Sequence, residues 1–79
     1  MIAPDSTGYS SHIKIDLNVD GVRLPVAQVG PNFMILRETR VVRPATNAVL
    51  SISVDGEVEE QAIVLPHGID GTSLEVTYF

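Results

Sequence analysis

The sequence predicts an all-β fold, a small sandwich or barrel of about six antiparallel strands built from two hairpins. Apolar and polar residues alternate beside two Asp-Gly pairs, Asp20-Gly21 and Asp55-Gly56. Alternation with a period of two indicates a strand with one face in water, and Asp-Gly is typical of a tight hairpin turn. Because no long stretch shows a convincing helical period, we expect strands throughout the domain.

The chain has room for one domain. It has 79 residues, of which 44% are hydrophobic. A domain of this size buries only about 60 to 65% of the surface that its unfolded chain exposes, so its stability margin is small. We expect a flexible polar tail at residues 1–11 and a single β domain at residues 12–79.

Charge and composition limit the expected partners and the compartment. The net charge is −5 and there is no cysteine. An acidic chain lacks the positive charge that neutralises phosphates, so we expect no nucleic-acid binding. We find neither the pattern of a signal peptide nor the apolar length of a membrane span. We therefore expect a cytoplasmic protein without membrane contact.

The first hairpin is predicted from its strand pattern and its turn. Ile13, Ile15, Leu17 and Val19 alternate with polar residues before Asp20-Gly21. A two-residue turn there makes every facing pair apolar, as expected across a buried face. The predicted pairs are Val19 with Val22, Leu17 with Leu24, and Ile15 with Val26.

The next segment is predicted to hold an irregularity, a turn and a strand. Pro25 cannot donate to a ladder, so its side of the second strand is expected to be an edge or a bulge. Gly30-Pro31-Asn32 is typical of a type I turn. Residues 33–36 are apolar on both faces, as in a central strand covered on both sides. Residues 37–46 follow no period and are predicted to be a connection.

The second hairpin is predicted to differ from the first in its turn. A two-residue turn at Asp55-Gly56 would set Glu57 and Glu59 opposite apolar residues and bury charge against the core. We therefore predict a three-residue loop from Val54 to Gly56, with Gly56 in a G1 bulge. The predicted pairs are Ile52 with Val58 and Ala48 with Ala62, and Glu60 falls opposite Leu50 without an explanation.

The chain ends with a predicted loop at residues 66–71 and a last strand in which Leu74, Val76 and Tyr78 alternate with polar residues. Its two halves also resemble each other at a spacing of 35 residues (54 − 19). The shared residues are Val19, Asp20, Gly21, Ala27, Val29 and Pro31, which match Val54, Asp55, Gly56, Ala62, Val64 and Pro66. Two interpretations stay open: common strand composition, or a duplicated hairpin unit whose halves pack face to face.

Three of the four arginines, Arg37, Arg40 and Arg43, lie in the predicted connection. Guanidinium groups suit phosphate and carboxylate recognition, so these residues are the candidate site for an anionic small molecule or nucleotide. They share one face only in a helical turn, because in an extended chain Arg40 points away from the other two. The alternative is intramolecular pairing with Glu38, Glu57, Glu59 or Glu60.

Catalytic and metal-binding constellations are not expected. His67 and Asp70 share one loop, but zinc needs three or four ligands and His12 is predicted on a distant strand. Ser51 and Ser53 lie beside glutamates rather than beside a histidine base. We predict that the protein is not an enzyme and has no catalytic residue, no metal and no cofactor.

The apolar surface favours a binding function. Phe33, Ile35, Ile63 and Leu65 form the predicted interaction surface, because one small sandwich cannot readily cover so much apolar area. The partner is expected to be another protein or a second copy in a homodimer. The acidic residues of the second hairpin are interpreted as edge charges that block sheet aggregation. We predict a small non-enzymatic interaction module, or alternatively a regulatory domain that binds an anion through its arginines.

Overall fold

Strands make up most of residues 12–79, the part of the chain that the computed structural model describes, while the predicted tail at residues 1–11 lies outside it. No helix in the described part is long and apolar enough to cross a membrane. The strands are β2 (Ile13–Val19), β3 (Val22–Val29), β4 (Phe33–Leu36), β5 (Val41–Val42), β6 (Thr46–Val54), β7 (Glu57–Leu65), β8 (Ile69–Asp70) and β9 (Glu75–Thr77).

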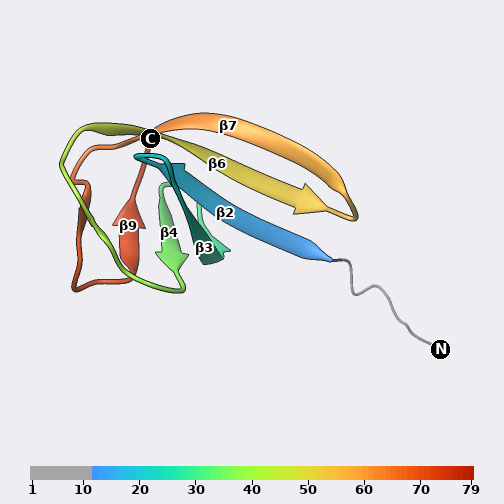
Figure 1. Ribbon diagram of the computed structural model, residues 1–79, viewed down its shortest axis with the longest axis horizontal. Coiled ribbons are helices and arrows are strands. Elements are labelled where there is room, and N and C mark those ends of the chain that lie inside the picture. Colours follow the sequence, from blue (N-terminus) through green and yellow to red (C-terminus); the bar gives the residue numbers. More distant parts are fainter. Residues whose placement is uncertain (1–11) are drawn as a thin grey trace.

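One antiparallel sheet dominates the molecule, and its strands follow the order β7-β6-β2-β3-β4-β9. It curls into a half-barrel (Figure 1). The predicted all-β class, with antiparallel strands built on two hairpins, is confirmed. β5 and β8 form a separate two-stranded sheet within segments predicted to be a connection and a loop. Two residues are too few to show a period, so the sequence contains no signal for either strand.

The first hairpin has the predicted register at its turn. Val19 pairs with Val22 and Leu17 with Leu24, and the ladder continues to Asp16 and Pro25. The predicted pair of Ile15 and Val26 lies beyond this ladder. The register of β3 against β4 shifts between Val26 and Gln28, next to Pro25, as expected for a residue without a backbone donor.

The prediction of a different turn in the second hairpin is wrong. Val54 pairs with Glu57, and Asp55 and Gly56 have φ of 51° and 87°, close to 52° and 74° at the first turn. Positive φ at both central residues is the type I′ turn. The prediction assumed that this end of the hairpin covers the core, whereas residues 57–62 are exposed. Their glutamates stay in water, and the tight turn buries no charge.

The same error reversed the two faces of β7. Ile63 pairs with Ala48, and Ile63 and Leu65 are 3% and 0% exposed. Side chains alternate with a period of two, so a register that is wrong by one residue moves each of them to the other face. Ile63 and Leu65 are core residues, and their assignment to an interaction surface is corrected.

The two hairpins are joined by a ladder between β2 and β6. Leu17 lies opposite Leu50, and Asp16 opposite Ser51. Asp16 and Ser51 are equivalent positions of the repeat (51 − 16 = 35), and both hairpins turn in equivalent registers. An approximate two-fold axis therefore passes near this pair, which supports the interpretation of a duplicated unit. The hairpins meet edge to edge in one sheet, in place of the predicted face-to-face packing.

The core lies on the inner face of the half-barrel and takes residues from both sheets. Val42 of β5 and Ile69 of β8 are buried with the inner residues of the larger sheet. On the outer face of β2, which was predicted to be wet, Asp16 is buried between Pro25 and Ser51 on the neighbouring strands. The largest fully buried side chains are Leu17, Met34, Leu36, Leu50 and Leu65.

We predict that Gly68→Ala destabilises the fold far more than Gly21→Ala. Both glycines have positive φ, at 61° and 74°, but a Cβ at Gly68 overlaps the backbone of Val42 and Arg43, whereas one at Gly21 meets no atom within 4 Å. The left-handed conformation alone costs an alanine about 1–2 kcal/mol, and overpacking against backbone raises the loss at Gly68 to about 2–4 kcal/mol. Urea unfolding of both variants measures the difference, and equal losses would contradict the packing of this loop against β5.

Candidate functional site

β7 is an edge strand, and only its side toward β6 is paired along its whole length. In a two-residue hairpin the residues that flank the turn form the first hydrogen-bonded pair, here Val54 and Glu57. Every second residue of β7 from Glu57 onward therefore bonds to β6, and the residues between them direct their N–H and C=O groups away. The free β7 edge is the row of outward backbone groups of Val58, Glu60 and Ala62.

The next outward residue, Val64, already has a partner. Its N–H donates to the carbonyl oxygen of Phe79 at 3.0 Å, and the Phe79 N–H donates back at 2.9 Å. Such a reciprocal pair is the hydrogen-bonded pair of an antiparallel ladder. It brings the chain after β9 against β7 and closes the curl at one end (Figure 1). In the described part of the chain, no strand continues this pairing toward Val58.

Tyr78 fixes the position of Phe79. Its side chain is buried, and its hydroxyl donates to the carbonyl oxygen of Gly30 at 2.7 Å. Its backbone N–H donates to the carbonyl oxygen of Asn32 at 3.1 Å. Phe79 itself is 75% exposed. The edge position opposite Val64 is thus filled by an ordered backbone with a solvent-facing aromatic ring.

Negative charge surrounds the free β7 edge. Glu57, Glu59 and Glu60 are exposed residues of β7, and Asp55 lies in the adjoining turn. The residues opposite the three glutamates on β6 are Val54, Ile52 and Ser51, which carry no charge. The cross-strand partners therefore leave the carboxylates without neutralisation, and this edge has a negative potential.

The edge belongs to an arm that extends beyond the core. The start of β2, the end of β6 and the start of β7 project together from the half-barrel (Figure 1). On the inner face of this arm Ile13 is 59% and Val54 42% exposed, and Ile15 and Ile52 are half-buried. A pocket of about 300 Å³ lies at its tip, and its lining includes Val54 and Glu59. The arm thus has an apolar inner face beside the acidic edge.

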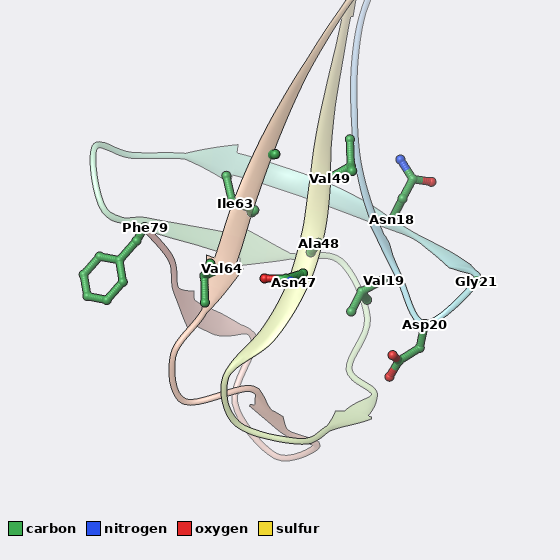
Figure 2. Close-up of a pocket in the computed structure, with 11 residues that line it drawn as sticks. Asn18, Val19, Asp20, Gly21, Asn47, Ala48, Val49, Ile63, Val64 and Phe79 are labelled. Atoms are coloured by element: carbon green, nitrogen blue, oxygen red, sulfur yellow. The ribbon is translucent and has the colours of Figure 1, made fainter.

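A larger groove lies on the outer face next to the free β7 edge. Its volume is about 580 Å³, and its lining includes Val49, Ala62, Val64 and Phe79 together with Asn18 and Asn47. Ala48 and Ile63 point into the core, so their neighbours Val49 and Ala62 point outward on the adjacent strands. Figure 2 shows Phe79 at one side of this groove and Asn18 and Asp20 at the other. Its apolar floor reaches the edge at Ala62.

The three predicted arginines lie on irregular chain around β5. Arg37 follows β4, and Arg40 and Arg43 flank Val41–Val42; all three are exposed. The segment is not the helical turn that would align them, and none of the three lines the outer groove. The Arg43 carbonyl oxygen accepts the Thr46 hydroxyl at 2.7 Å. An anion site at these residues stays a prediction.

Phe33 and Ile35 are half-buried residues of β4. Ile35 faces Gln28 on β3 and Glu75 on β9. An interaction surface at these two residues also stays a prediction. In one direction along the sheet β3, β2 and β6 lie between β4 and β7. In the other direction only β9 and the residues after it do, because Phe33 pairs with Thr77 and Phe79 bonds to Val64.

The loop that contains His67 and Asp70 is shaped by backbone interactions. The Asp70 carboxylate accepts hydrogen bonds from the N–H groups of Thr72 at 2.8 Å and Ser73 at 3.0 Å. Gly71 has a φ of 85°, as a tight turn requires. Within residues 12–79 there is no group of three or more His, Cys, Asp or Glu residues that could hold a metal ion.

The sequence alone did not predict the free β7 edge. The acidic pattern of the second hairpin is visible in the sequence, but which strand lies at an edge depends on the β2–β6 ladder. That ladder joins residues about half the chain apart, as with Asp16 and Ser51. Comparisons with protein families, characterised proteins and solved structures find no match to this chain.

We predict that Asp70 titrates below its usual range. Hydrogen bonds from the backbone of Thr72, and then of Ser73, lower the pKa of the Asp70 carboxyl from the ordinary 3.8. A lowered pKa contributes stability above the pKa of the unfolded chain, and this contribution is lost as the pH falls through the folded value. Asp70→Asn should therefore destabilise the protein most near neutral pH, and the difference should shrink below about pH 4. NMR titration of the carboxyl with unfolding curves checks this, and a midpoint above 3.8 would contradict it.

Proposed function

We propose that the protein is a small, non-enzymatic interaction module that binds an extended segment of a partner protein by strand addition to the free β7 edge. The observation that carries the proposal is the reciprocal hydrogen bonding of Val64 and Phe79 at 3.0 and 2.9 Å. At this position β7 already bonds to a second backbone on the side that faces away from β6. The next outward residues along β7, Ala62, Glu60 and Val58, present N–H and C=O groups on the same side at the same two-residue spacing.

Backbone bonding alone gives weak binding at this edge. The three outward residues offer one N–H and one C=O each, and a net hydrogen bond contributes about 0.5–1.5 kcal/mol. The sum of about 3–9 kcal/mol is comparable with the 4–15 kcal/mol that association costs. Side-chain contacts must supply the remainder. The apolar groove beside Ala62 and the carboxylates beside the edge are the available groups.

The charge favours a basic partner over a second copy. Two β7 edges paired antiparallel about Glu60 would set Glu60 opposite Glu60 of the other copy. Like charges directly opposite each other destabilise a sheet, and an acidic row attracts a positively charged strand. We propose a partner segment rich in Lys or Arg, and cytoplasmic action, in keeping with a cysteine-free chain.

We predict that Glu60→Pro strongly weakens partner binding without unfolding the protein. The N–H of Glu60 points away from β6, so proline there removes an edge donor and keeps the β6–β7 ladder. The probes are ten-residue peptides selected from a phage-displayed random library on the wild-type protein. Their affinity, measured by calorimetry, should fall by about tenfold or more in Glu60→Pro.

Glu60→Gln is the matched control, because it removes the same charge and keeps the donor. It should weaken the selected peptides by less than Glu60→Pro does. Circular dichroism and unfolding curves establish that both variants are folded. The proposal is rejected if the library yields no binder, or if the selected peptides bind Glu60→Pro as well as Glu60→Gln.

A further inference from the structure

We infer that the free β7 edge selects a strand of defined direction and side-chain order: antiparallel to β7, with the pattern apolar, polar, basic, basic, apolar, basic from its N-terminus. This inference rests on the proposed function and adds the chemistry of the partner. It follows from which residues of β7 direct their backbone groups away from β6, and from the side chains beside each edge position. The six partner positions lie opposite Ala62, Gln61, Glu60, Glu59, Val58 and Glu57.

The direction follows from the pairing that already exists. Phe79 is bonded to Val64 as in an antiparallel ladder, and the chain from β9 to Phe79 runs toward Ala62 along the edge. A partner strand that continues this ladder therefore starts near Phe79 and ends near the tip of the arm. Its first residue exchanges both hydrogen bonds with Ala62, its third with Glu60 and its fifth with Val58.

The faces follow from the burial of β7. Ile63 and Leu65 point into the core, so Glu57, Glu59 and Gln61 share the inner face while Val58, Glu60 and Ala62 lie on the outer face. Directly opposite residues in an antiparallel pair place their side chains on the same face, with Cβ atoms about 4.5–5.5 Å apart. Partner residues one, three and five thus lie on the outer face, and residues two, four and six on the inner face.

On the outer face, apolar partner side chains are favoured at the two ends, opposite Ala62 and Val58. Opposite Ala62 the partner side chain enters the groove that Val49 and Phe79 line, and the small alanine leaves room for a leucine or isoleucine. Opposite Val58, which is 60% exposed, an apolar residue covers a side chain now in water. Between them Glu60 favours a lysine or arginine.

The inner face calls for positive charge. Glu59 and Glu57 are exposed and face the uncharged Ile52 and Val54 on β6, so a partner lysine or arginine meets no competing cation from that strand. Gln61 favours a polar residue such as threonine. Each opposite-charge pair across strands changes affinity by about 1.5- to 5-fold, so three pairs together change it on the order of tenfold.

The test compares synthetic peptides that carry Leu-Thr-Arg-Arg-Val-Lys between neutral flanks. One control has the same composition with its apolar residues at the second and fourth positions, so that sliding cannot restore the pairing. The other control has the reversed order. Calorimetry with the full chain should show the designed peptide binding about tenfold more tightly than either control.

A charge exchange tests one contact directly. Glu59→Lys should weaken binding of the designed peptide by about tenfold, and a peptide with glutamate at its fourth position should regain affinity for that variant only.

Equal binding of the three peptides, or no recovery on charge exchange, overturns the inference. If binding in those cases is still lost in Glu60→Pro, strand addition stands and only the assigned pattern fails. If no peptide binds and Glu60→Pro has no effect on library binders, the proposed function fails as well.

Discussion

The antiparallel ladder between β2 and β6 is the interaction on which the rest of the structure depends. A lone hairpin is marginally stable in water, because one of its faces stays exposed. The ladder joins two hairpins into a continuous sheet and sets Leu17 against Leu50 at the centre of the core. On one side β4 and β9 extend this sheet beyond β3, while on the other side it stops at β7. The open edge is therefore a consequence of how the hairpins join.

The two type I′ turns determine how that edge is presented. Because Asp55-Gly56 turns in two residues, β7 directs alternate backbone groups outward and places Ile63 in the core. A turn one residue longer would direct the other set of β7 backbone groups outward and would move Ile63 to the outer face. Both turns adopt the same geometry because each has Asp-Gly at its two central positions, and these residue types tolerate positive φ. The acidic residues of β7 tolerate this register because the arm carries them beyond the core (Figure 1).

An unpaired edge strand can bind a partner strand, but it can also cause aggregation. Unpaired strand groups are templates for aggregation, and charged side chains are a common defence. Glu57, Glu59 and Glu60 oppose pairing with another copy of the same strand, since like charges would face each other. The same carboxylates attract a basic segment. Protection against self-association and selection of a partner therefore arise from one set of side chains.

Local chemistry in the sequence determined the strands of the larger sheet, the position of both hairpin turns and the register of the first, because alternation and Asp-Gly preferences act over a few residues. It did not determine the register of the second hairpin, since that required knowing whether Glu57 and Glu59 lie over the core or beyond it. Nor did it reveal β5 and β8, which are too short to show a period. Only the tertiary structure decided which strand is left at the edge and which face of β7 is buried. Both depend on the pairing of residues far apart in the chain, such as Leu17 with Leu50 and Val64 with Phe79.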